Sequence, residues 1–290
     1  MAITSEWRTV VQQQHLWRQC LAEVVGTFIL VFFGVGVVNT AVITGAQAGL
    51  WQVAVVWGIG IAVAIYATAS TSGAHLNPAV TVALAAFRRF PWRNVLPYIL
   101  AQLIGAILAS AVLYAIFAGP IATFEAAHHI VRGAAGSELS AMVFGQYFPN
   151  PAMLATTPAL AAVTLPLAML AEGIGTALLV FVIFTVTDEQ NEGRPPAYLA
   201  PVFIGFTVSM LISILAPISQ AGFNPARDFG PRIIAWLAGW GTVAIPGPHG
   251  EFFTVYILAP VLGGLLGGIA YKYLLGKVHA ECTLASPCDD

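Results

Sequence analysis

Six apolar runs, each long enough to cross a lipid bilayer as a helix, constrain the fold of this chain more than any other feature. A hydrocarbon core of roughly 30 Å is spanned by about 20 helical residues. Runs near this length occupy residues 20–38, 51–69, 95–117, 160–186, 199–216 and 253–275. Charged residues make up 8% of the chain, whereas a soluble domain carries roughly 25%. The sequence therefore predicts an all-α integral membrane protein with six transmembrane helices.

Two shorter apolar runs, residues 78–87 and 225–237, each follow the tripeptide Asn-Pro-Ala. They are too short to cross a bilayer, so we predict half-membrane re-entrant helices. Asn is a favoured N-cap, and Pro suits the first position of a helix because its missing N–H has no partner there. The two motifs, Asn77-Pro78-Ala79 and Asn224-Pro225-Ala226, therefore predict loops that enter a helix at its N-terminus.

The two halves of the chain repeat one another with an offset of about 150 residues. The matching anchors are Ala22–Thr27 with Ala171–Thr176, Gly58 with Gly205, the first Asn-Pro-Ala with the second, and Tyr98–Ala101 with Tyr256–Ala259. Each half holds three spans, and because three is odd the second half enters the membrane from the opposite face. Such inverted repeats place their functional sites near the midplane, on the pseudo-two-fold axis. The two re-entrant helices are expected to meet there.

The positions of Lys and Arg predict the orientation in the membrane, because cytoplasmic loops are enriched in both. Eight fall on one side of the predicted spans: Arg8, Arg18, Arg88, Arg89, Arg93, Arg194, Lys272 and Lys277. We expect this side and both termini to be cytoplasmic in a multi-pass protein of the plasma (inner) membrane. The polar N-terminal segment does not resemble a cleavable signal peptide.

The same boundaries predict the domain organisation. The expected segments are a cytoplasmic N-terminal segment (1–19), a membrane domain (20–276, with repeat one at 20–117, an extracellular linker at 118–159 and repeat two at 160–276) and a cytoplasmic tail (277–290). Cys20 lies at a span edge, and Cys282 and Cys288 lie in the tail, where reduced thiols are the default. A metal held by the tail pair is a weaker alternative. The net charge of -2 gives no reason to expect a nucleic-acid partner.

Two helix N-termini that meet at the midplane predict a lumen with a positive electrostatic potential and hydrogen-bond donors. Irregular backbone inside a membrane must be buried in protein or line a water-filled cavity. Each helix N-terminus carries a partial positive charge, and the amides of Asn77 and Asn224 can donate hydrogen bonds into a lumen. Such a place repels cations, hydronium included, and orients a passing oxygen so that a proton wire is interrupted.

With these features the chain resembles the major intrinsic protein family, the aquaporins and aquaglyceroporins. The resemblance covers about residues 20–276 and includes the paired Asn-Pro-Ala motifs, Arg227 three residues after Asn224, and the two Ala-Glu-x-x-Gly-Thr helices. It implies an aquaporin-like fold, a right-handed six-helix bundle with a pore in each subunit and a homotetramer in the lipid bilayer. It also implies a channel that is not an enzyme and needs no cofactor.

The resemblance implies pore-lining residues before each motif. A ladder of backbone carbonyls is expected from Gly73, Ala74, His75, Leu76, Gln220, Ala221, Gly222 and Phe223. The alternative for His75, a metal or proton-relay site, lacks Cys, Asp or Glu partners at ligand spacing, so we expect no metal. The family's selectivity filter maps to Trp51, Ile212, Ala221 and Arg227. The competing interpretation of Arg227 is an ion pair with Asp228.

The filter sequence departs from the patterns of both main branches of the family. Water-selective members have His opposite Ile212, whereas glycerol facilitators tend to have Gly there and an aromatic residue opposite Ala221. A wall that is apolar on three sides, with one Arg donor, suits an alkyl chain bearing hydroxyls. Asp228 and Arg232, and the sequence HHIVRG from His128, also resemble the glycerol branch, whereas Tyr256-Ile257 does not. We predict passive conduction of glycerol, other small neutral solutes and water, with exclusion of protons and ions. A water-dominant aquaporin is the alternative.

Two carboxylates, Glu23 and Glu172, fall inside predicted spans, where a charge is expensive unless donors surround it. The resemblance implies that each holds the N–H groups of one re-entrant loop, a structural support to which Asp228 also belongs. A proton-coupled secondary transporter is the less favoured alternative, because inverted repeats suit transporters too. Motifs of an intramembrane hydrolase such as H-E-x-x-H or G-x-S-x-G are absent from the sequence.

Overall fold

The computed structural model describes residues 15–88 and 90–276, which form helices and loops without a strand. The predictions that concern Arg8, Arg89, Lys277, Cys282 and Cys288 lie outside the described residues. Six helical segments are long and apolar enough to cross a membrane: Leu16–Val42, Leu50–Ser72, Trp92–Ala127, Leu165–Thr187, Ala197–Ser219 and Glu251–Gly276. The prediction of an all-α protein with six spans is confirmed.

The helices follow the predicted order along the chain. Their bounds are α2 Leu16–Val42, α3 Leu50–Ser72, α4 Pro78–Phe87, α5 Val95–Ala127, α6 Glu138–Ala141, α7 Pro151–Leu154, α8 Leu165–Thr187, α9 Ala200–Ser219, α10 Pro225–Ala235, α11 Glu251–Phe253 and α12 Ala259–Ala270. π-helical turns extend α10 over Trp236–Trp240 and connect or extend the last span at Thr254–Leu258 and Tyr271–Gly276.

The two largest errors in the predicted boundaries both involve proline. The third span continues to Ala127, ten residues beyond the predicted end, with Pro120 inside the helix. Its last turns are stabilised because Glu125 is 8% exposed and accepts bonds from Arg132 and Ser140. The fourth span begins at Leu165 rather than at residue 160, since a proline suits the first turn of a helix.

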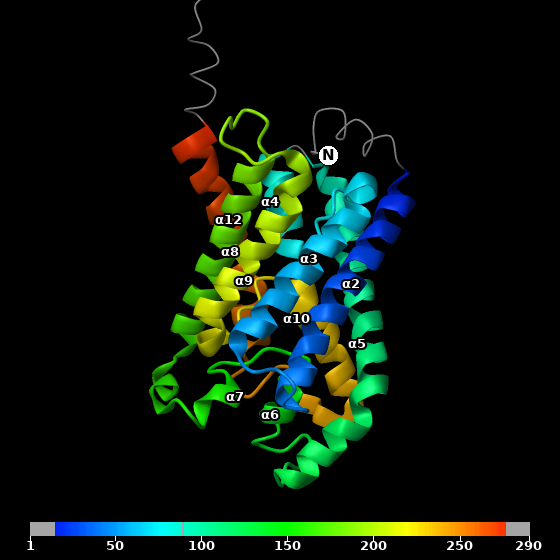
Figure 1. Ribbon diagram of the computed structural model, residues 1–290, viewed down its shortest axis with the longest axis vertical. Helices are drawn as coiled ribbons and strands as arrows, with labels where there is room; N and C mark the ends of the chain where they lie inside the picture. The colour runs from blue at the N-terminus through cyan, green and yellow to red at the C-terminus, as the bar shows by residue number, and fades with distance from the viewer. Residues whose placement is uncertain (1–14, 89, 277–290) are drawn as a thin grey trace, which may run out of the picture.

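The two repeats interlock, as Figure 1 shows with α2 and α5 on one side of the bundle and α8 and α12 on the other. Within each repeat the first span packs against the second and third, α2 on α3 and α5, and α8 on α9 and α12. Each half-helix packs against the third span of the other repeat, α4 on α12 and α10 on α5. The described chain begins and ends at one end of the bundle, with α6 and α7 at the opposite end.

Glycines let the spans approach each other at backbone distance. At the crossing of α3 and α9, a Cβ on Gly58 would lie 2.6 Å from the carbonyl oxygen of Gly205. The corresponding crossings within the repeats use Gly105 against Val24 and Gly263 against Gly173. Since backbone atoms cannot move aside, a side chain at Gly58, Gly105 or Gly263 would separate the helices.

Candidate functional site

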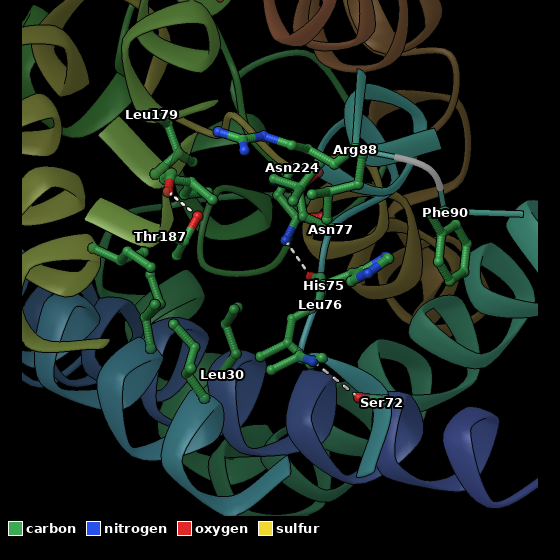
Figure 2. A pocket seen from close by; sticks show the side chains of 18 of the residues that line it. Leu30, Ser72, His75, Leu76, Asn77, Arg88, Phe90, Leu179, Thr187 and Asn224 are labelled. Atoms are coloured by element: carbon green, nitrogen blue, oxygen red, sulfur yellow. Dashed lines mark hydrogen bonds between the residues drawn. The ribbon is translucent and has the colours of Figure 1, made fainter. Parts of the chain in front are cut away.

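The asparagine of each Asn-Pro-Ala motif is hydrogen-bonded to the residue that precedes the other motif, across the centre of the bundle. The side-chain oxygen of Asn77 accepts from Ala79 N at 2.9 Å, so the residue caps α4. Its amide nitrogen donates to the carbonyl of Phe223 at 2.8 Å, and that of Asn224 donates to the carbonyl of Leu76 at 2.8 Å. Figure 2 shows Asn77 and Asn224 side by side at the cavity, with the bond of Asn224 dashed. The N-termini of α4 and α10 therefore meet at one place.

Two buried carboxylates hold the irregular segments that precede the motifs. Glu23 accepts from His75 N at 2.9 Å and Leu76 N at 2.7 Å. In the second repeat, Glu172 accepts from Gly222 N at 2.8 Å and Phe223 N at 2.7 Å. Both carboxylates are 0% exposed, and hydrogen bonds of this kind offset the cost of burying a charge.

Further side chains complete these supports, and the sequence interpretation did not single them out. The hydroxyl of Ser72 donates to Glu23 at 2.7 Å and that of Ser219 donates to Glu172 at 2.6 Å. Gln102 Nε2 adds a bond to Glu23 at 2.8 Å. The signal in the sequence was weak, because the two serines lie among other small polar residues near span ends.

The backbone of both irregular segments is unusual. Ala74, Leu76, Gln220, Ala221 and Phe223 have φ between 51° and 62°, a left-handed conformation that non-glycine residues rarely adopt. Successive N–H groups are thereby directed to the buried carboxylates. We interpret this as the geometry of the predicted carbonyl ladder.

A cavity of about 1070 Å³ runs along this arrangement. Its wall includes six of the predicted ladder residues, both motif asparagines and Arg227: Gly73, Ala74, His75, Leu76, Gly222, Phe223, Asn77, Asn224 and Arg227. Apolar side chains such as Leu30 and Leu179 face them (Figure 2). Gln220, in contrast, does not line this cavity. The wall therefore has a polar backbone side and an apolar side.

Arg227 lies on the cavity wall with an unused donor. Its Nη1 is buried and has no hydrogen-bond partner among the described residues. The guanidinium carbon lies 4.5 Å from the centre of the Trp57 ring, a cation–π contact. The prediction that Trp51 accompanies Arg227 is wrong: Trp51 is 61% exposed and Trp57, on the cavity wall, takes that place. Trp57 and Trp51 are six residues apart, so they occupy different faces of α3.

Ile212 and Ala221 are buried, with exposures of 5% and 4%. Both belong to the same buried cluster as Trp57, but neither lines the described cavity. Their assignment to the filter therefore stays a prediction.

Asp228 is paired with a residue other than Arg227. Its carboxylate accepts from Arg232 Nε at 2.7 Å and from Gln146 N at 2.8 Å, and both side chains of the ion pair are buried. Arg232 also donates to the carbonyls of Ala244 and Gln146. This network fixes the loop residue Gln146 against α10. It leaves Arg227 without an ion pair to Asp228.

A third Asn-Pro-Ala, at Asn150–Ala152, escaped the sequence interpretation although the same three letters could have revealed it. Its asparagine also accepts from its own helix, at Ala152 N, and donates across to another segment, at the carbonyl of Ala216. The difference lies in the length of the helix after the motif, since α7 ends at Leu154. The tripeptide alone specifies a cap, and the apolar run after it makes a half-helix.

The surroundings of His75 agree with a structural role. Its Nδ1 lies 3.3 Å from Thr81 Oγ1, and its ring packs against Phe90 and Tyr98. Across residues 15–88 and 90–276 no group of three or more His, Cys, Asp or Glu side chains could hold a metal ion. Cys20 is a free, partly buried thiol.

Comparison with known proteins gives one consistent result. The family model for the major intrinsic protein matches residues 10–271. The glycerol uptake facilitator protein of Escherichia coli K12 is 42% identical over 274 residues, 94% of this chain and 93% of that protein. The propanediol uptake facilitator PduF of Salmonella typhimurium is 42% identical, covering 89% of this chain and 94% of that protein.

A solved structure resembles the fold as well. It is the aquaglyceroporin from Plasmodium falciparum, which superposes with a TM-score of 0.78 over 92% of this chain and 100% of that chain. The sequence identity is 24%, so this likeness describes the fold alone.

Proposed function

This chain belongs to the major intrinsic protein family, and we propose that it is a passive channel for glycerol and other small uncharged solutes, water included, that excludes protons and ions. The observation that carries the proposal is the symmetric pair of hydrogen bonds at the wall of the central cavity, from Asn77 to the carbonyl of Phe223 and from Asn224 to the carbonyl of Leu76. Glycerol and propanediol, which give the relatives their names, are both small, neutral and rich in hydroxyls.

The lining suits such solutes on both of its sides. Backbone carbonyls and the free Nη1 of Arg227 offer acceptors and a donor to hydroxyl groups. Leaving a buried donor unpaired costs about 1–3 kcal/mol, which a passing hydroxyl offsets. The Trp57 ring and leucines such as Leu30 and Leu179 accept the carbon chain without competing for hydrogen bonds.

Exclusion of cations and protons is explained by the positive ends of α4 and α10. Two helix N-termini add partial positive charges where the asparagines meet, and Arg227 adds a full one. A solute oxygen that accepts from Asn77 and Asn224 has its lone pairs engaged, so it cannot pass a proton along a chain of waters.

A proton-coupled transporter is not favoured by the contacts of the two buried carboxylates. Glu23 accepts four hydrogen bonds and Glu172 accepts three. Every oxygen is engaged by a loop N–H or a neighbouring side chain, which suits a rigid support better than a moving proton.

The assembly proposed for the channel is a homotetramer with both termini in the cytoplasm. Large apolar side chains cover the outside of the bundle, among them Leu96 at 64%, Ile214 at 70% and Leu266 at 60% exposure. Such a surface suits lipid tails and neighbouring subunits.

The test is stopped-flow light scattering on proteoliposomes, first with a glycerol gradient and then with sucrose. Passive conduction predicts faster glycerol equilibration than in empty liposomes, with a low activation energy and no response to an uncoupler. Flux that an uncoupler abolishes would instead support the transporter.

A further inference from the structure

The loop between α6 and α7 is hydrogen-bonded to Gln220 at the end of α9, directly before the second irregular segment. Tyr147 N donates to the side-chain oxygen of Gln220 at 2.6 Å, and the amide of Gln220 reaches back to the carbonyl of Met142 at 3.4 Å. Gln146 Nε2 donates to the backbone carbonyl of Gln220 at 3.2 Å. Three bonds thus join the loop to one residue of the pore segment.

The backbone conformation of Gln220 explains why the residue needs these hydrogen bonds. It ends α9 with φ at 62°, in the left-handed region that favours glycine. The equivalent position in the first repeat is Gly73, which ends α3 with φ at 84°. Gly73 adopts this turn freely, whereas Gln220 has a Cβ that opposes it and side-chain bonds that hold it.

Asn150 provides a second hold on the same helix end. Its backbone N–H donates to the carbonyl of Pro217 at 3.2 Å and its side chain donates to the carbonyl of Ala216 at 3.1 Å. The Ala216 carbonyl also accepts from Gln220 N at 3.0 Å, so one acceptor joins the loop and the turn. Asn150 is 6% exposed, which shields both bonds from water.

We infer that Asn150 and Gln220 are positioning residues that set the width of the pore beside Gly222 and Phe223, which line the cavity. They act from outside the lumen, by fixing the turn from which Ala221, Gly222 and Phe223 continue. Glu172 holds this segment on its far side, at Gly222 N and Phe223 N. Hydrogen bonds therefore fix the segment at both ends. Removing the bonds to the loop is expected to widen the range of solute sizes that pass. This inference rests on the proposed function.

The experiment compares solute size limits in proteoliposomes. The parent, Asn150→Ser and Gln220→Gly are reconstituted at matched density, and the permeability of a five-carbon linear polyol is divided by that of glycerol. Ser still caps α7 but is too short to reach Ala216, and Gly keeps the left-handed turn while removing the two side-chain bonds to the loop. Thr156→Ala, at an exposed position just after α7, is the matched control.

We expect the polyol-to-glycerol ratio to rise about threefold in both variants, as loss of one or two hydrogen bonds implies, and to stay unchanged in Thr156→Ala. A ratio is independent of how much protein inserts, so reduced folding alone does not move it. If one variant fails to assemble, the other decides. Unchanged ratios in a glycerol-conducting parent and its variants overturn this inference alone, whereas a parent that conducts no glycerol overturns the proposed function as well.

Discussion

Arg227 and Trp57 form one unit at the cavity wall, with the guanidinium carbon 4.5 Å from the centre of the indole ring. The ring covers one face of the cation, and Nη1 has no acceptor among the described residues. The pair therefore presents an apolar surface beside a donor. Trp57 is held in place because its ring packs directly on Gly34, where an added Cβ would collide with it.

Trp57→Phe tests this pair, with Trp51→Phe as the matched control on the same helix. Phe is smaller and is a weaker cation–π partner, so Arg227 gains freedom and the apolar wall shrinks. We expect the glycerol-to-water permeability ratio to fall by about three- to tenfold for Trp57→Phe. Trp51→Phe, at an exposed position, is expected to match the parent. A larger effect of Trp51→Phe would restore Trp51 to the filter.

Glu23→Gln and Glu172→Gln are expected to differ in severity. Each carboxylate oxygen of Glu23 accepts two hydrogen bonds, so replacing either oxygen by an amide NH₂ breaks two of them. In Glu172, Oε2 accepts only from Phe223 N, so an NH₂ at that position breaks one hydrogen bond. Bonds to a charged acceptor contribute about 1.5–3 kcal/mol each. Thermal unfolding in detergent should therefore show the larger loss for Glu23→Gln. Solute preference is expected to stay the same in both, and equal losses would contradict this account.

Asp188, directly after α8, gives a pH-dependent contribution to stability. Burial raises its pKa, but bonds from Tyr271 at 2.6 Å and Gln190 N and the charge of Arg88 outweigh this, so the pKa is lowered. A carboxyl with a lowered pKa stabilises the fold above its unfolded value of about 3.9, and this is lost as pH falls through the folded value. We expect Asp188→Asn to melt about 2–4 °C below the parent at pH 7.

The same comparison at acidic pH supplies the control for Asp188. As the pH falls below about 3.9 the unfolded chain takes up a proton at Asp188, and as it falls through the lowered pKa of the folded state the parent's own Asp188 becomes protonated too, so the gap between the two melting temperatures should close. A gap that persists unchanged in acid would mean that the stabilisation does not come from the charge of Asp188.

The count of spans and the inverted repeat could be predicted because both depend on long, regular patterns. Apolar runs fix where helices cross, and four matching anchors fix the parity of the second half. The end of α5 could not be predicted, since Pro120 looks like a break until Glu125 is seen to bind Arg132 and Ser140.

The sequence does not show which face of each helix points into the bundle, and this explains the error at Trp51. The predicted span that contains Trp51 and Trp57 is apolar around its whole circumference, so hydrophobicity does not say which tryptophan faces inward. Tertiary contacts decide it, through the close fit of Trp57 on Gly34. The bonds made by Ser72, Ser219 and Gln102 likewise depend on residues far apart in the sequence.

Ile212→His tests whether Ile212 belongs to the constriction. Ile212 is 5% exposed and shares a buried cluster with Trp57 and Ala221, but the described cavity does not reach it. If it lines the filter, His adds a second donor near Arg227 and removes an apolar wall. A glycerol carbon pressed against that donor leaves it unpaired, which costs about 1–3 kcal/mol, or roughly five- to a hundredfold in rate. Water molecules in single file can accept from both donors, so the water permeability should fall much less than the glycerol permeability. The measurement is the glycerol-to-water permeability ratio at matched protein density, and a ratio within about twofold of the parent would remove Ile212 from the filter.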